Sequence, residues 1–279
     1  MLYDYIRPEE RMLIDSSRRK GIKLILHKSE DFFCDALELF DRQEFQNVVL
    51  QRSISYFRSL HLTALLENRG ITVINSSDIA SMCGNKLITT LVLAREKIAA
   101  PKTYIAFNVD SALKLLSRIG YPAIIKPIIG SWGRLVAPLK DPESARAILE
   151  DRANMFPMYQ IYYIQEMVQR PPRDIRCFVI GNEVIAAIYR YSVPDEWRTN
   201  TARGGKVENC EITSELEDLS LRTAKAFGDG IFGVDLMESP DGLLVNEINY
   251  TTEFKNSVSA TGIDIPGLIL DYALGRMKN

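Results

Sequence analysis

One stretch decides the fold of this chain: Val234-Asp235-Leu236, then Ser239-Pro240-Asp241-Gly242, then Val245-Asn246-Glu247-Ile248-Asn249. Two apolar runs flank a segment whose residues are typical of a tight turn. Proline presets φ at the second turn position, and glycine accepts a positive φ after the aspartate. The pattern therefore predicts a β-hairpin built on a type I turn with a glycine bulge.

The predicted hairpin brings acidic side chains together. Counting back from the turn places Asp235 opposite Glu247, and the alternation of side chains puts Glu247 and Asn249 on one face. Carboxylates that face each other across strands repel, so we expect a cation between them. Mg²⁺ takes one or two carboxylates together with substrate phosphates. The sequence thus predicts a magnesium site at Asp235, Glu247 and Asn249, the alternative being a solvated hairpin with incidental acids.

The composition is that of a globular protein with 279 residues, 46% hydrophobic and 25% charged. A net charge of -2 gives no basic field for nucleic acid. No apolar run reaches the ~18 residues of a membrane span, and the N-terminus has no signal-peptide pattern. Four widely spaced cysteines without a C-x-x-C pair indicate reduced thiols in a cytoplasm rather than zinc or disulfides. We therefore expect a cytoplasmic protein with no nucleic-acid or membrane partner.

The order of strand and helix patterns divides the chain into three parts. Residues 1–84 alternate strands (22–26, 48–50, 71–75) with helices (8–20, 56–68), which predicts a small parallel α/β domain. Residues 85–165 begin with a helix and continue with a β-α-β-β-α order, which is compatible with a separate lobe. Residues 166–279 are rich in strands and contain the hairpin. The fold class predicted from this is mixed α/β and α+β.

Lys126 ends an apolar strand and is followed by the loop Pro127-Ile128-Ile129-Gly130-Ser131-Trp132-Gly133-Arg134. Glycine-rich loops offer backbone N–H groups to phosphate oxygens, and an arginine adds a bidentate contact. The lysine and Ser131, Trp132, Gly133 and Arg134 therefore form a candidate phosphate site. A surface turn after a strand would look the same, and the P-loop pattern is absent.

Two further segments are rich in polar groups. Gln165-Glu166-Met167-Val168 ends a strand before a proline pair and could hold a nucleotide base, although it could equally be a plain strand end. Arg173-Asp174-Ile175-Arg176 follows, with Asp174 and Arg176 on one strand face. Cations then cluster near glycines, where they can bind carboxylates or phosphates: Arg190, Arg198, Arg203 and Lys206, with Asn200 among them.

In their order along the chain, these motifs resemble those of the ATP-grasp carboxylate–amine ligases, specifically the RimK-like branch. The resemblance covers nearly the whole chain. It is carried by Gly84-Asn85-Lys86, Lys126 with its loop, Gln165-Glu166-Met167-Val168, Arg173-Asp174-Ile175-Arg176, Asn200 with Arg203, and Asp235 with Glu247-Ile248-Asn249. Within this branch, residues 129–134, 200–205 and 252–257 resemble ligases of lysine biosynthesis that act on an amino-group carrier protein, LysW.

The resemblance implies an ATP-grasp fold behind a small α/β pre-ATP-grasp domain, with ATP held between two lobes. ATP would be bound by Lys86, Lys126, Ser131, Trp132, Gly133, Arg134, Gln165, Glu166, Val168, Asp174 and Arg190. The catalytic side chains would be Arg176, Asn200 and Arg203, and Mg²⁺ would lie on the hairpin acids. The acceptor pocket would comprise Thr251, Thr252, Glu253, Phe254, Asn256 and Ser257.

The implied reaction has two steps. A carboxylate attacks the γ-phosphate of ATP to give an acyl phosphate, and an amine then displaces phosphate. The carboxylate would be the side chain of the C-terminal glutamate of LysW, the amine that of 2-aminoadipate, and the enzyme a homo-oligomer. The alternatives are a relative that uses glutamate for arginine biosynthesis, a ligase that adds glutamate to a ribosomal protein, and a nucleotide-binding regulator without catalysis.

Overall fold

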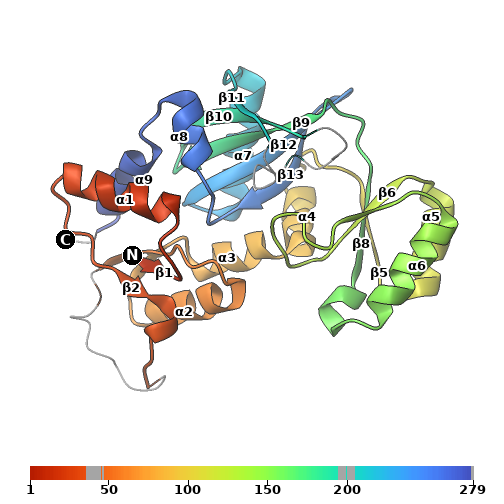
Figure 1. The fold of residues 1–279 in the computed structure, drawn as a ribbon, viewed down its shortest axis with the longest axis horizontal. Helices are drawn as coiled ribbons and strands as arrows, with labels where there is room; N and C mark the ends of the chain where they lie inside the picture. The colour runs from red at the N-terminus through yellow and green to blue at the C-terminus, as the bar shows by residue number, and fades with distance from the viewer. Residues whose placement is uncertain (36–44, 46, 194–198, 200–204, 278–279) are drawn as a thin grey trace.

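The structure is a computed structural model, and it describes residues 1–35, 45, 47–193, 199 and 205–277 (Figure 1). Asn200 and Arg203, two of the predicted catalytic residues, lie outside the described residues. None of the described helices combines the length and the apolarity that a membrane crossing requires. The fold class predicted from the sequence is confirmed, with two parallel strand pairs followed by two antiparallel sheets.

The N-terminal part pairs β1 with β2 and β3 with β4 in parallel. Its elements are β1 (Leu2–Tyr3), α1 (Pro8–Arg19), β2 (His27–Lys28), a 3-10 turn (Ser29–Asp31), β3 (Val48–Leu50), α2 (Tyr56–Asn68), β4 (Thr72–Ile74) and α3 (Ser77–Gly84). The predicted strand at residues 22–26 is wrong, because this segment pairs with no strand of the described residues. Its Ile22 and Leu24 pack on the apolar core beside α9, and pairing begins only at His27.

The central lobe is a four-stranded antiparallel sheet in the order β5-β8-β6-β7, covered by two helices whose apolar sides form its core. This part of the chain contains α4 (Lys86–Arg95), β5 (Thr103–Ala106), α5 (Val109–Ile119), β6 (Ala123–Lys126), β7 (Ala137–Leu139), α6 (Pro142–Ala153), a 3-10 turn (Pro157–Gln160) and β8 (Tyr162–Glu166). Helix α4 packs with α3 and α7 rather than in the core of this sheet. Figure 1 shows this sheet with α5 and α6 on the right, whereas α4 lies beside α3 near the middle of the molecule. The β-α-β-β-α order predicted from the sequence is confirmed.

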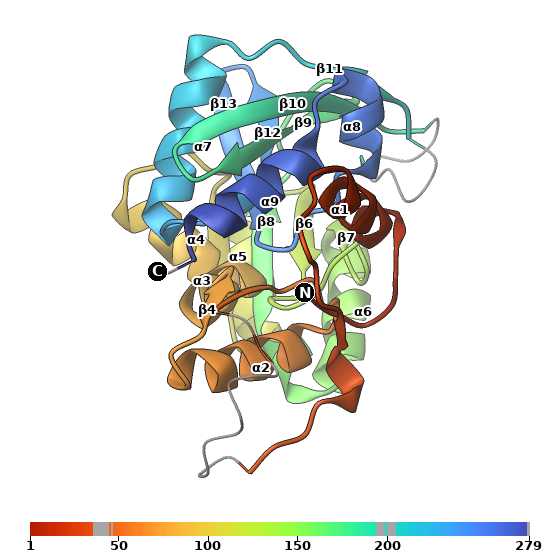
Figure 2. The same ribbon diagram turned by 90° about the vertical axis from the view of Figure 1, so that its left-hand side faces the viewer.

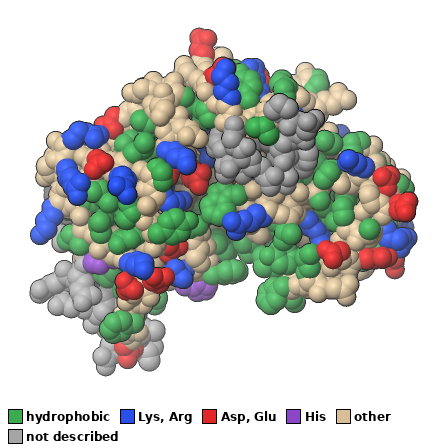
Figure 3. All heavy atoms as spheres, viewed as in Figure 1, with side chains coloured by type: hydrophobic (Ala, Val, Ile, Leu, Met, Phe, Trp, Pro, Cys, Tyr) green, Lys and Arg blue, Asp and Glu red, His purple; other side chains and the backbone are tan. Residues whose placement is uncertain are grey.

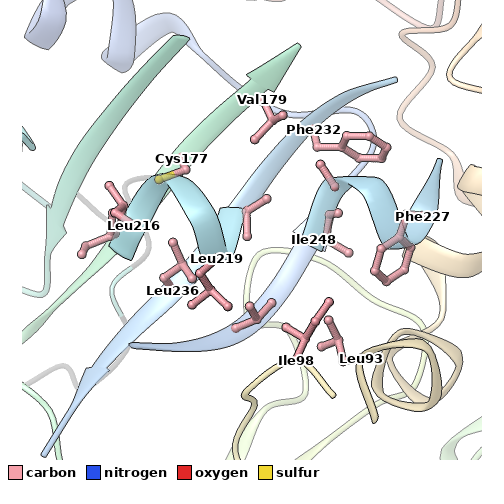
Figure 4. Packing of buried hydrophobic residues seen from close by; sticks show 14 of the residues in the cluster. Leu93, Ile98, Cys177, Val179, Leu216, Leu219, Phe227, Phe232, Leu236 and Ile248 are labelled. Atoms are coloured by element: carbon pink, nitrogen blue, oxygen red, sulfur yellow. The ribbon is translucent and has the colours of Figure 1, made fainter. Parts of the chain in front are cut away.

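The C-terminal lobe is a five-stranded antiparallel sheet in the order β11-β10-β9-β12-β13. It comprises β9 (Arg173–Ile180), β10 (Glu183–Tyr191), β11 (Val207–Asn209), α7 (Ser214–Phe227), β12 (Ile231–Ser239), β13 (Gly242–Asn249), α8 (Lys255–Thr261) and α9 (Ile265–Gly275). Figure 2 shows α7 on one side of this sheet and α8 on the other. Leu216, Leu219 and Phe227 of α7 pack on strand residues such as Cys177 and Phe232 (Figure 4).

The opposite face of this sheet is divided along its length. Phe178, Ile180 and Ile188 form its apolar half and pack with Ile269 of α9. The other half of the same strands carries charged side chains, because the alternation that buries Phe178 also turns Arg176 toward this face. The apolar half anchors the sheet, and the charged half is left for the site.

The predicted hairpin is present, and Asp235 pairs with Glu247 as expected. The glycine bulge is not where the sequence placed it. Ser239 pairs directly with Gly242, and the register shifts instead between Asp235 and Leu236. The extra residue on β13 is therefore Asn246, whose side chain is turned out of the regular alternation.

Candidate active site

One cavity of about 400 Å³ lies where the three parts of the chain meet, and all three contribute to its wall. Most of the site residues predicted from the sequence line it. They are Lys86, Lys126, Ser131, Trp132, Gly133, Arg134, Asp174, Arg176, Arg190, Asp235, Glu247, Asn249, Thr251, Thr252 and Glu253. Segments as far apart in sequence as 86 and 253 therefore converge, as a site between lobes requires.

Lys126 is the most unusual of these residues, because its buried ammonium forms no ion pair within the described part of the chain. Its side chain is 8% exposed and donates to Gln165 Oε1 at 2.6 Å and to Asn246 Oδ1 at 2.9 Å, both neutral oxygens. Burial lowers the pKa of this ammonium to about 8. A buried cation that faces neutral partners inside a cavity is suited to an anionic ligand.

Lys86 joins the cavity wall to the glycine loop. It is the first residue of α4, where the side chain of Asn85 caps the helix by accepting from Leu87 N at 3.0 Å. Lys86 Nζ donates to Gly130 O at 2.9 Å and to Glu247 Oε1 at 3.0 Å. One lysine thus connects the loop to the hairpin acid.

The glycine loop continues with residues in left-handed conformations, including Gly133 at φ 66 and Trp132 at φ 58. The indole of Trp132 donates to Glu253 Oε1 at 3.2 Å, and the guanidinium of Arg134 lies 4.8 Å from its ring centroid. Glycine accepts this backbone without strain, whereas a tryptophan does so only when its side chain is fixed. The indole contact with Glu253 supplies such a fixed point over the cavity.

The hairpin acids are neutralised by cations of the chain itself. Arg176 binds Asp235 with two hydrogen bonds of 2.7 Å, and Arg190 approaches the same carboxylate at 3.0 Å while binding Asp174. Burial acts to raise the pKa of Asp235, but Arg176 and Arg190 hold it below its ordinary value. Glu247 has Lys86 as its partner. The repulsion expected from the sequence is therefore offset without a metal.

The oxygen donors of the predicted magnesium site nevertheless stand together. Asp235 and Glu247 are directly paired across the strands, and Asn249 Nδ2 lies 3.3 Å from Asp235 Oδ2. Within the described residues, no group of three or more His, Cys, Asp and Glu side chains could hold a metal ion. A cation at this hairpin would rest on two carboxylates and one amide oxygen, which suits Mg²⁺ only when a ligand supplies further oxygens.

The remaining predicted residues are not part of the described cavity wall. The Gln165 side chain reaches Lys126 from β8, and the Glu166 carboxylate accepts from Lys102 N at 2.8 Å. Phe254 is fully buried in the apolar core and is not part of the described cavity wall. Asn256 and Ser257 line a small adjacent hollow. Val168 is not part of the described lining of the cavity or of the hollow.

Sequence reasoning missed several residues of the wall. Asn246 was not predicted, because regular alternation places it on the face opposite Glu247, and only the bulge turns it toward Lys126. Arg7 enters the wall from the start of α1. The only sequence feature that pointed to Arg7 was the acid three residues later, Glu10, which predicts an ion pair. An arginine–glutamate pair at that spacing is also common on helix surfaces, so it did not indicate a site.

The charges of the wall favour an anionic ligand. Among the described lining residues, seven are basic: Arg7, Lys86, Lys126, Arg134, Arg170, Arg176 and Arg190. Four are acidic: Asp174, Asp235, Glu247 and Glu253. A cavity that concentrates one sign of charge between low-dielectric walls raises the local concentration of counter-ions.

Comparisons with known proteins agree with this geometry. Residues 83–273 match the RimK-like ATP-grasp domain, and residues 1–82 match the LysX preATP-grasp domain. The chain is 38% identical over 274 residues to the alpha-aminoadipate–LysW ligase LysX of Saccharolobus solfataricus, covering 98% of this chain and 99% of that protein. It is 34% identical over 277 residues to the glutamate–LysW ligase ArgX of Sulfurisphaera tokodaii, covering 98% and 96%.

Among solved structures, a RimK domain protein from Sphaerobacter thermophilus shares the fold, with a TM-score of 0.79 at 23% identity and 98% and 99% coverage. The order of domains, the cavity between lobes and the family matches point the same way. The chain belongs to the RimK-like ATP-grasp family, whose members are ATP-dependent ligases, and it begins with a LysX-type pre-ATP-grasp domain.

Proposed function

We propose that this chain joins the α-amino group of 2-aminoadipate to the side-chain carboxylate of the C-terminal glutamate of LysW, in lysine biosynthesis. The observation that carries an ATP-driven reaction is the buried Lys126, which faces neutral oxygens in a cavity with more cations than acids. The choice of 2-aminoadipate rests on the 38% identity to a LysX ligase, against 34% to an ArgX ligase.

Lys86, Lys126 and the loop Ser131 to Arg134 would bind the phosphates of ATP. Gln165, Glu166 and Val168 would hold the adenine, and Asp174 and Arg190 would line the nucleotide side. Arg176 would neutralise charge at the reacting centre, and Asn200 and Arg203 remain predictions for the same role. These assignments follow from the resemblance; the position of the first two lysines in the cavity wall supports them.

Asp235, Glu247 and Asn249 would hold Mg²⁺, since their carboxylate and amide oxygens fit a hard cation. When bound, the ion would neutralise phosphate charge during transfer. Because Arg176 and Lys86 now occupy these carboxylates, we expect both cations to move toward the phosphates when the ion binds. These three donors thus fit the ion, provided that Mg²⁺ replaces Arg176 and Lys86 as the partner of the carboxylates.

The residues of the chain would act by positioning and by charge. Phosphoryl transfer asks little covalent chemistry of a protein, so alignment and neutralisation of charge supply the rate. Cys83 lines the cavity, but burial raises the pKa of its thiol well above the ordinary value, so it stays protonated and is a poor nucleophile. The amino acid amine, rather than an enzyme group, attacks the acyl phosphate.

The closest alternative is the glutamate–LysW reaction, because its ArgX relatives cover the chain equally well. A ligase acting on a ribosomal protein would share the same ATP site. A regulator without catalysis would be expected to lack a phosphate lysine or a metal ligand, and the chain retains Lys86, Lys126 and all three hairpin donors.

The decisive assay combines purified protein, ATP, Mg²⁺ and LysW with either 2-aminoadipate or glutamate, followed by intact mass of the carrier. A mass gain of one aminoadipyl group is expected. A gain only with glutamate would favour the arginine-pathway reaction, and no gain with either amino acid would contradict a LysW ligase.

We also propose that residues 1–84, 85–165 and 166–279 act as the three domains, in a cytoplasmic homo-oligomer with no nucleic-acid or membrane partner. The four cysteines are free in the structure, which suits a reducing compartment. On the face drawn in Figure 3, basic and acidic side chains are interspersed, which gives no broad basic surface there for nucleic acid.

The rate should depend on pH through Lys126. Because its pKa is about 8, the ammonium of the free enzyme is lost as pH rises through 8, and kcat/KM for ATP should fall above that pH. The free energy of unfolding should instead rise with pH between about pH 8 and pH 10.5, because the unfolded chain binds more protons than the folded one in that range. A pH profile of kcat/KM measures the first effect, and thermal melts the second. A profile flat from pH 7 to 10 would contradict the assignment.

Docking of the carrier should be sensitive to salt. The carrier in this family is a small acidic protein, and the cavity wall is rich in cations. Complementary charge speeds encounter and is screened within about 8 Å at physiological salt. Raising salt should therefore increase the KM for the carrier more than the KM for ATP or amino acid.

Charge reversal should reproduce the salt effect if it is electrostatic. Arg170 lines the cavity, and Lys206 is an exposed partner of Glu208. Arg170→Glu or Lys206→Glu should raise the carrier KM. Arg222→Glu is the matched control, because Arg222 also pairs with a surface acid, Asp218, but lies on α7 across the sheet. A carrier KM that stays flat with salt would refute electrostatic docking.

A further inference from the structure

Arg7, at the start of α1, presents an unused edge to the cavity. Its Nε and Nη2 donate to the two oxygens of Glu10 at 2.8 and 2.7 Å, and Nη2 also approaches Arg52 O at 3.4 Å. The remaining nitrogen, Nη1, lies 3.9 Å from Glu253 Oε1, its one acidic neighbour in the described part of the chain. That separation is beyond hydrogen-bond length, so the Nη1 hydrogens have no acceptor among the described residues.

The guanidinium of Arg7 is firmly held. Glu10 is fully buried and also accepts from Arg52 Nε at 3.0 Å, so one carboxylate orients two arginines. Arg52 in turn donates to Thr252 O at 3.1 Å, which connects α1 to the segment after the hairpin. A fixed guanidinium loses little conformational entropy when it binds a planar carboxylate.

Two hydroxyl groups of the same wall also lack partners. Both residues, Thr251 and Thr252, line the cavity, and their Oγ1 atoms are buried without a hydrogen-bond partner among the described residues. Thr252 Oγ1 lies against Gly233, which is outside the described cavity wall. Thr252 is 2% exposed. Buried polar groups are almost always paired, so unpaired hydroxyls in a cavity wall call for a ligand. Arg7 Nη1 and the Thr251 hydroxyl can both act as donors, a combination that suits a carboxylate.

We propose that Arg7 binds a carboxylate of the amino-acid substrate, with the hydroxyl of Thr251 completing the site. The inference rests on the proposed function and adds to it a binding residue from the pre-ATP-grasp domain. Glu253 lies between Arg7 and the indole of Trp132, so it is also placed to respond when the carboxylate arrives. Glu253 would thereby connect the bound amino acid to Trp132 of the glycine loop.

The test compares Arg7→Gln and Arg7→Lys with the wild type. Loss of a charge-assisted hydrogen bond should raise the KM for 2-aminoadipate about tenfold or more in Arg7→Gln, while the KM values for ATP and carrier stay within about twofold. Arg7→Lys keeps the charge without the fork and should lie between. Thr251→Val should raise the same KM by a smaller factor.

Arg58→Gln is the matched control. Arg58 lies in the same domain, pairs with Asp4 at 2.9 Å and is not part of the described cavity wall, so its loss should leave all three KM values unchanged. Thermal melts check folding, and Arg7→Lys keeps the test valid if Arg7→Gln fails to fold. An unchanged KM for amino acid, or a rise in the KM for ATP or carrier instead, would overturn the inference.

A calorimetric titration separates this inference from the proposed function. 2-Aminoadipate is added without carrier, so the measurement needs no turnover. Weaker binding to Arg7→Gln than to wild type supports the inference, and equal binding, or none to the wild type, overturns it. A wild type that binds 2-aminoadipate but never modifies LysW would defeat the proposed acceptor and leave the carboxylate site standing.

Discussion

Lys126→Ala should nearly abolish ATP turnover while the protein remains folded. The ammonium at this position has only neutral oxygens as partners and faces the cavity, so the phosphates of ATP would be its missing counter-charge. Losing a charge-assisted hydrogen bond costs about 1.5–3 kcal/mol, which corresponds to about tenfold to 150-fold in kcat/KM. The loss should exceed this range if the lysine also stabilises the transferring phosphoryl group.

The measurement is steady-state ATP turnover together with a thermal melt. Lys114→Ala is the matched control, because Lys114 is exposed on α5 of the same lobe and lies outside the cavity wall that the structure describes. Lys126→Arg restores the charge without the shape and should recover part of the activity. A Lys126→Ala protein with wild-type turnover would remove this residue from the site.

Much of the fold could be predicted because its signals are local. Helix α2 matches its predicted bounds, residues 56–68, since apolar periodicity and a following glycine mark it. The short helices α3 and α8 were missed, as was strand β11, because none of them is long enough to show a period. Whether an apolar run becomes a strand depends on a neighbour, which the sequence of residues 22–26 does not reveal.

The site was predictable where residue type alone carries the chemistry. Lysines, glycines and hairpin acids were found, and they do line one cavity. Their partners were not found, because pairing depends on register between strands far apart in sequence. Asp235 faces Arg176 only because β9 and β12 are neighbours. Asn246 reaches Lys126 only through a bulge, which shifts one residue out of alternation.

Those partners change what is expected of the hairpin acids. Two unpaired carboxylates would make Glu247→Gln stabilising without metal, by relief of repulsion. The structure removes that reason, because Glu247 already binds Lys86 at 3.0 Å and Asp235 binds Arg176. The Glu247–Lys86 pair is partly exposed, so its loss should cost only up to about 1 kcal/mol. Glu247→Gln should therefore be slightly less stable, not more.

Activity should respond far more strongly than stability. Glu247→Gln replaces a charged oxygen ligand with a neutral amide, so we expect turnover to fall about a hundredfold and the Mg²⁺ concentration for half-maximal rate to rise about tenfold, the latter corresponding to ~1.4 kcal/mol. Titration of Mg²⁺ against the rate, with equilibrium binding of Mg²⁺ and nucleotide as a second readout, measures both.

Glu238→Gln is the matched control. It breaks a similar ion pair, with Arg173 at 2.7 Å, on the same hairpin but outside the described cavity wall. The control should lose comparable stability and keep its Mg²⁺ requirement. If Glu247→Gln also keeps the wild-type requirement, the hairpin does not hold the metal, and Lys86 and Arg176 are its permanent partners.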